Sequence, residues 1–112
     1  MDISPESPAC KPTPVRKRLQ NRRACETFAF QHQGADFTMS TGCYPDGTMG
    51  EVFINAAHAN SALDALASDA AIALSFALQH GADLSTIELA MKRTAGGDPS
   101  SPIGAALDRL LP

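Results

Sequence analysis

The stretch that decides the fold is EVFINAAHANSALDALASDAAIALSFALQHG, residues 51–81, within which the apolar spacing changes. At its start, Val52 and Ile54 alternate with polar or outward-facing neighbours, which is typical of a strand. Residues 61–80 then place leucine and alanine at helical spacing, and Gly81 follows as the expected C′ residue. The stretch therefore predicts a strand that passes through a short corner into a long helix.

The expected helix also carries a start signal and a wide apolar surface. Ser61 and Asp64 form an S-x-x-D capping box. Ile72 and Phe76 widen the apolar surface beyond one stripe, so we expect other parts of the molecule to contact this helix on two sides.

Upstream of this stretch the sequence predicts two further strands. Apolar residues alternate with others over 25–31 and again over 37–41, and a turn at 32–35 separates the two runs. Residues 44–47, YPDG, are a second turn signal, because proline presets φ and glycine tolerates a positive φ. With the strand at 49–55, these connections predict an antiparallel meander, one face of which the long helix covers.

Downstream, two shorter helices are expected. Ser85 and Glu88 form another capping box after Leu84, and residues 94–100 are a flexible connector. A last short helix begins at Ser101, with proline in the first helical position. The expected fold class is α+β: a three-stranded antiparallel sheet packed on a long central helix, plus a second helix and a short C-terminal helix.

The length of 112 residues suits one domain with a tail. Residues 1–22 contain four of the eight prolines and few large apolar side chains, so we expect a disordered basic arm followed by the domain at 23–112. No apolar run approaches the roughly 18 residues of a membrane span, and the N-terminus lacks the pattern of a secretory signal. A cytoplasmic protein without membrane contact is expected.

The net charge of −3 conceals an asymmetry between arm and body. Residues 1–23 hold six basic and two acidic side chains, whereas 24–112 hold three basic and ten acidic ones. Such an arm suits an anionic target such as nucleic acid. Alternatively it is a solvated tail, or folds back on its own acidic body. The candidate nucleic-acid contacts are Arg16, Lys17, Arg18, Arg22 and Arg23, among which no aromatic residue supplies a stacking platform.

The three cysteines, Cys10, Cys25 and Cys43, show no C-x-x-C spacing, and the three histidines are equally scattered. We therefore expect no metal site and no cofactor. Free thiols are the expectation in a reducing compartment, with Cys10 exposed, although Cys25 and Cys43 could meet across the sheet.

Candidate ligand-binding residues gather at the corner between the third strand and the long helix, where backbone N–H groups point outward. Ordinary capping and turn chemistry is the alternative role for them. No motif for a catalytic nucleophile or a phosphate loop is present in its required context, so no catalytic residue is assigned. The corner residues are Glu51, Asn55, His58 and Asn60.

The last helix presents an apolar stripe that includes Ile103, Leu107 and Leu111. The stripe either seals the core or docks on another protein. If it docks, an exposed apolar patch should remain on the folded domain.

Four stretches carry a family resemblance: EVFIN at 51–55, AIALSFALQHG at 71–81, LSTIELAM at 84–91 and SPIGAALD at 101–108. Together they resemble the TSCPD domain found at the C-terminus of cobalamin-dependent (class II) ribonucleotide reductases, which also occurs as small stand-alone proteins. The resemblance covers about residues 23–111.

The resemblance implies an accessory or regulatory interaction role in deoxyribonucleotide supply, with a reductase or another nucleotide-metabolism protein as partner. The segment that names the family contains a cysteine, whereas residues 97–102 here read GDPSSP, so no metal or thiol role is carried over. The reductase's catalytic barrel and cobalamin site need a far longer chain, so we expect no ribonucleotide reduction by this chain alone. The rival functions are nucleic-acid binding through the arm and nucleotide binding at the corner.

Overall fold

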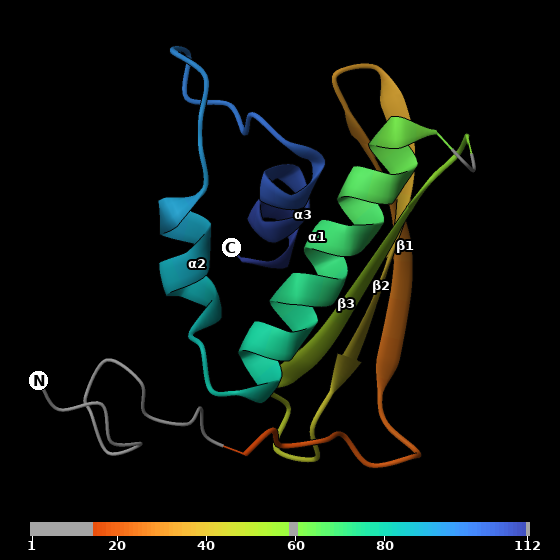
Figure 1. The fold of residues 1–112 in the computed structure, drawn as a ribbon, viewed down its shortest axis with the longest axis vertical. Coiled ribbons are helices and arrows are strands. Elements are labelled where there is room, and N and C mark those ends of the chain that lie inside the picture. Colours follow the sequence, from red (N-terminus) through yellow and green to blue (C-terminus); the bar gives the residue numbers. More distant parts are fainter. Residues whose placement is uncertain (1–14, 59–60, 112) are drawn as a thin grey trace, which may run out of the picture.

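The computed structural model describes residues 15–58 and 61–111. These residues form an α+β domain, as the sequence predicts, with all three helices on one side of a three-stranded sheet (Figure 1). The elements are β1 (Cys25–His32), β2 (Ala35–Cys43), β3 (Met49–Ala56), α1 (Ala62–Gln79), α2 (Leu84–Ala90) and α3 (Pro102–Leu110).

The sheet is the predicted antiparallel meander, in the order β1-β2-β3. Its first turn places Gln33 and Gly34 at positive φ, the geometry of a tight hairpin. In the second, the Gly47 N–H donates to Tyr44 O at 2.9 Å while Gly47 adopts a φ of 90°. The turn chemistry thus sets the register that puts every large apolar strand residue except Phe53 on the helix-covered face.

The core lies between that sheet face and helices α1 and α3. Phe30 of β1 stacks on Phe37 of β2 with ring centroids 5.3 Å apart. Alanines on α1 let the helix approach the sheet closely, and Leu107 of α3 is completely buried. The buried apolar cluster comprises Phe30, Phe37, Met39, Val52, Ile54, Ala67, Ala71, Leu74, Leu78, Ala106 and Leu107.

Helix α1 also closes the free edge of β3. β3 is an outer strand, and its even-numbered residues turn backbone groups away from β2 toward α1. Polar side chains of α1 bond these groups in antiparallel order, so that the edge is not open to another strand. The bonds are Asp64 Oδ1 with Ala56 N (2.8 Å), Ser68 Oγ with Ile54 O (2.8 Å), Ser75 Oγ with Val52 N (2.8 Å) and O (2.9 Å), and Gln79 Nε2 with Gly50 O (2.9 Å).

The long helix begins and ends where the sequence predicts. Ser61 is the N-cap and accepts from Asp64 N, and Gly81 has a φ of 94°. The Asp64 carboxylate, however, accepts the Ala56 N–H of β3. A side chain expected to complete a local cap therefore joins helix to sheet.

The start of α2 differs from the prediction. Asp83 is the N-cap, and its carboxylate accepts from Thr86 N at 3.1 Å, so the expected Ser85–Glu88 box is wrong. Asp83 directly precedes the helix, so its carboxylate reaches the first free N–H groups, and negative charge is favourable at that end. Leu89 is 82% exposed and thus remains outside the core.

The segment expected to be a flexible connector is a closed loop. Arg93 pairs with Pro99 in an isolated β-bridge, and the Thr94 N–H donates to Asp98 O at 2.8 Å. Arg93 also forms an ion pair with Asp108 of α3 at 2.6 Å. The loop is therefore tied to α3, which starts at the predicted Ser101 cap.

Residues 16–23, here named the strap, lie against the body although the sequence places 1–22 in a disordered arm. The Lys17 N–H donates to Gln79 O at 2.8 Å, and the Tyr44 hydroxyl donates to Lys17 O. Leu19 lies over Gly50, where a Cβ would come within 3.0 Å of its methyl groups. Residues 1–14, including Cys10, lie outside the described residues.

Among the described helices, α1 alone is long and apolar enough to cross a membrane. Its buried residues face the sheet, and its polar side chains bond β3. These contacts make α1 the central helix of the folded domain. The cytoplasmic location stays a prediction.

Candidate functional site

The predicted corner residues do not form one cluster. Glu51 lies at the beginning of β3, buried to 5% exposure, and Asn55 lies exposed near its other end. Phe53 stands between them on the same, uncovered sheet face. His58 is exposed beyond the strand, and Asn60 lies outside the described residues.

Glu51 is instead the partner of the strap. Its Oε2 lies 2.7 Å from Arg23 Nε, and its Oε1 accepts from Arg23 Nη2 at 3.2 Å. The carboxylate lies over Gly42 of the neighbouring strand, where a Cβ would come within 2.7 Å of it. The Arg23–Glu51 pair therefore joins the strap to the uncovered face of the sheet near the start of β3.

The basic residues of the strap divide into engaged and free ones. Arg16 donates through Nε to Gln79 Oε1 and stacks on Phe76, with its guanidinium carbon 4.5 Å from the ring centroid. Lys17 lies over the Tyr44 ring at 4.7 Å. Arg18 and Arg22 are exposed and form no hydrogen bond or ion pair within residues 15–58 and 61–111. Part of the predicted nucleic-acid-binding charge thus holds the strap to the body.

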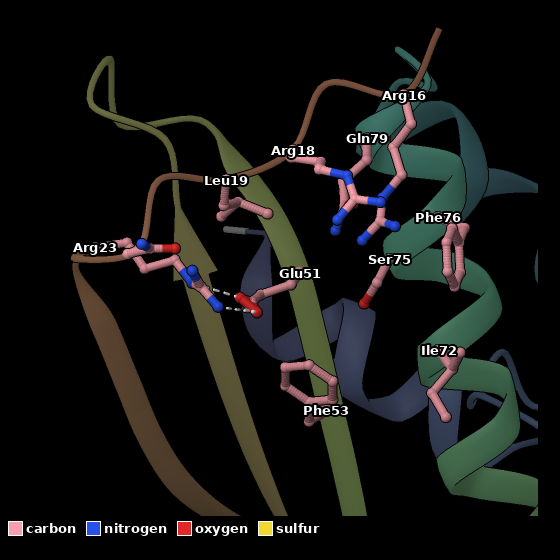
Figure 2. Close-up of a pocket in the computed structure, with 11 residues that line it drawn as sticks. Arg16, Arg18, Leu19, Arg23, Glu51, Phe53, Ile72, Ser75, Phe76 and Gln79 are labelled. Carbon is pink, nitrogen blue, oxygen red and sulfur yellow. Dashed lines mark hydrogen bonds and ion pairs between the residues drawn. The ribbon is translucent and has the colours of Figure 1, made fainter.

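Strap, β3 and α1 enclose a pocket of about 370 Å³ (Figure 2). Figure 2 shows the side chains of Arg16 and Arg18 pointing into one end of the pocket, while Phe53 and Ile72 lie at the other. Phe53, Ile72 and Phe76 are 47%, 44% and 45% exposed, so the pocket has apolar walls open to solvent. Its lining is Arg16, Arg18, Leu19, Asn21, Arg23, Glu51, Phe53, Ile72, Ser75, Phe76 and Gln79.

A second hollow, here named the groove, runs between α1, α2 and α3. Its volume is about 410 Å³ and its walls are almost wholly apolar. Ile103 lines it, whereas Leu107 is in the core and Leu111 is partly buried, so the three residues of the predicted stripe have separate environments. The groove is lined by Ala70, Ala73, Leu74, Ala77, Ile87, Met91 and Ile103.

The described part of the chain includes two of the three cysteines and most of the acidic side chains. No group of three or more His, Cys, Asp and Glu side chains among those residues is placed to hold a metal ion. Cys25 and Cys43 are free thiols, and Cys25 is paired in register with Gly42.

The acids with shifted titration lie at turns and helix ends. The hydrogen bond from Arg93 lowers the pKa of Asp108, and bonds from Ser85 and Thr86 lower the pKa of Asp83. Hydrogen bonds from Thr48 likewise lower the pKa of Asp46. These shifts mark capping and loop closure, and none belongs to a residue that lines the groove.

Comparison with known proteins shows that part of the chain is similar in sequence to part of an enzyme. A 73-residue segment, 65% of this chain, is 40% identical to the vitamin B12-dependent ribonucleotide reductases of Streptomyces coelicolor and Streptantibioticus cattleyicolor. A 74-residue segment is 36% identical to the enzyme of that name from Rhodopirellula baltica. The chain is related to a segment of vitamin B12-dependent ribonucleotide reductase. No family model and no solved structure matches it.

The match to the reductases covers only 7% to 12% of their length. The predicted relationship to a ribonucleotide reductase is thereby confirmed, while the assignment to the TSCPD domain stays a prediction. In the reductases, the related segment is joined to a much longer chain.

Sequence reasoning misses the pocket under the strap. The pocket depends on residues 16–23 and 51–79, which are far apart in sequence, and no local motif indicates it.

Proposed function

We propose that this chain is an accessory module that docks on a ribonucleotide reductase and regulates deoxyribonucleotide supply. The relationship to a reductase segment supports the choice of partner. The observation that carries the proposal is the apolar groove, an uncovered surface of the kind through which a small module meets a larger protein.

The surface of α1 beside the groove has the spacing of a helix-packing seam. Five apolar residues follow one another at intervals of three, four, three and four, as in the core positions of a coiled coil. We call Leu63, Leu66, Ala70, Ala73 and Ala77 the α1 seam. Leu66 is 71% exposed, and the alanines allow another helix to approach closely.

The occupant that fits this surface is an amphipathic helix of the reductase. A helix laid along the α1 seam would place its apolar residues against Ala73 and Ala77 and extend into the groove toward Ile87 and Met91. Strand addition at β3 is a poorer fit, because α1 side chains already form hydrogen bonds with the free edge of that strand. On the uncovered face of the sheet, β1 and β2 carry mostly polar, exposed residues.

The proposal is tested by titrating the purified chain into the purified vitamin B12-dependent ribonucleotide reductase of the same cells. Complex formation is followed by calorimetry and by light scattering after gel filtration. A one-to-one complex per reductase chain is expected. Replacing Leu66→Glu puts a charge on the α1 seam and should weaken the complex at least tenfold, since an unpaired charge would be buried.

Leu89→Glu is the matched control. Leu89 is an exposed leucine on α2 that does not line the groove, so this variant should bind as the parent chain does. The proposal is contradicted if no complex forms at tens of micromolar. It also fails if the two variants weaken binding equally, or if the chain covers its seam only with a second copy of itself.

A further inference from the structure

We infer that the pocket under the strap is a binding site for a phosphate-bearing ligand with an attached flat ring, the chemistry of a nucleotide. The inference is independent of the proposed docking role, because the pocket and the groove lie on different sides of α1. It rests on the distribution of charge, aromatic surface and free donors within the pocket.

The first observation is the charge of the pocket. Arg16, Arg18 and Arg23 contribute three positive charges, and Glu51 is the only acid among the described residues that lines it. Residues 24–112, Glu51 included, carry an excess of seven negative charges, counted as three basic against ten acidic side chains. A net positive hollow on an acidic body attracts an anion.

The second observation is the supply of unused donors. Arg23 is held by Glu51, and the Arg16 Nε by Gln79. The two Nη groups of Arg16 and the whole guanidinium of Arg18 make no hydrogen bond within the described residues. Guanidinium groups bind phosphate through paired N–H donors, and two of them that line one pocket provide several such donors for one anion.

The third observation is the opposite, apolar end. Phe53 from β3 and Ile72 from α1 are each nearly half exposed there, whereas Phe76 lies under the Arg16 guanidinium (Figure 2). The flat ring of Phe53 favours a ligand ring that can stack on it. A volume of about 370 Å³ is within the range of small-molecule sites.

Placement of the groups selects the ligand class. Cationic and apolar ends lie in one pocket, so a ligand must carry its phosphate and its ring within one small molecule or one chain end. An extended peptide fits less well, because the nearest strand edge, that of β3, is already bonded by Ser75 and Gln79. A free mononucleotide and the 5′-phosphorylated end of a single strand share the required chemistry.

The test is calorimetric titration of the purified full chain with adenosine 5′-monophosphate, alongside inorganic phosphate and adenosine. Saturable one-to-one binding of the nucleotide is expected, at least tenfold tighter than that of either half. Replacing Arg18→Gln should weaken it tenfold or more, since a charge-assisted bond is lost. Phe53→Ala should weaken the nucleotide and adenosine but leave phosphate unchanged.

Arg22→Gln is the control, because Arg22 carries the same charge in the same segment and does not line the pocket. It should change binding less than twofold. All three altered side chains are exposed or half exposed, so circular dichroism melting should match the parent chain. Parent-like melting shows that any loss of binding is local.

A 5′-phosphorylated oligothymidylate distinguishes the two sources. Tighter binding of the mononucleotide, weakened by Arg18→Gln, supports the pocket with a free nucleotide as ligand. Tighter binding of the oligonucleotide, with the same sensitivity to Arg18→Gln, supports the pocket with a strand end as ligand. The inference is overturned if no nucleotide binds at millimolar concentration. It is equally overturned if binding depends on Arg22 as much as on Arg18, or does not respond to Phe53→Ala.

Discussion

The two sides of helix α1 show how one helix can serve two purposes. Toward the sheet, α1 is buried and bonds the edge of β3 through Asp64, Ser68, Ser75 and Gln79. Away from the sheet it presents the α1 seam, which is apolar, largely small and, within the described residues, exposed or partly exposed. The first side holds the domain together, and on our account the second side meets the partner.

The comparison predicts that changes beside the sheet reduce stability, while similar changes on the seam reduce binding only. The largest effect is expected in the core against the sheet. Leu107→Ala removes a completely buried side chain and should lower the free energy of unfolding by about 2–5 kcal/mol. Urea denaturation measures it. Leu89→Ala, at an exposed leucine, is the control and should change little.

A smaller loss is expected from the ladder between α1 and β3. Ser75→Ala leaves the buried Val52 N–H without its acceptor at 2.8 Å, which should cost about 1–3 kcal/mol. The mirrored change on the seam is Ala73→Ser, which adds a hydroxyl in solvent and should cost no more than about 0.5 kcal/mol. Equal losses in denaturation experiments would break the distinction between the two sides.

Leu66→Glu should leave stability within about 0.5 kcal/mol of the parent chain, because Leu66 is mostly exposed. The same variant is the one expected to lose the reductase complex. Thermal melting and binding are measured on one preparation. A variant that both melts early and fails to bind would show that the seam is structural.

The smallest effect concerns the loop between α2 and α3. Arg93 lowers the pKa of Asp108 in the folded chain, so their pair stabilises the fold above the unfolded pKa of about 3.9. That stabilisation is lost as pH falls through the lower folded pKa. Asp108→Asn should therefore flatten the acid side of a stability profile between about pH 5 and 2. A profile that keeps the parent's slope would refute this role of the pair.

The sequence predicts the strands, the two hairpin turns and the long helix well, because their signals are local. Alternation puts Val52 and Ile54 inward, and Gly47 and Gly81 occupy the positive-φ positions that their turns require. The Asp64 carboxylate is harder to foresee, since its partner, Ala56, is fixed only when strand and helix have packed. Asp83 caps α2 in place of Ser85. Both residues are possible local caps, and the S-x-x-E spacing at 85–88 does not show which of them the helix uses.

The candidate sites are less accessible to sequence reasoning than the fold. Arg16 and Gln79 are 63 positions apart, and nothing near either residue indicates that they meet. Glu51 lies at the beginning of β3, where it pairs with Arg23, and the extended strand separates it from Asn55 at the corner. The groove likewise depends on how α2 and α3 dock beside α1, which no single motif determines.

The most direct test of the docking account is methyl NMR of the labelled chain with and without the reductase. Ile87 and Ile103 line the groove, whereas Ile54 is buried in the core and Ile72 lines the pocket under the strap. The account predicts that the methyl signals of Ile87 and Ile103 shift or broaden on binding, while those of Ile54 and Ile72 remain in place. Changes at Ile72 alone, with Ile87 and Ile103 unaffected, would contradict it.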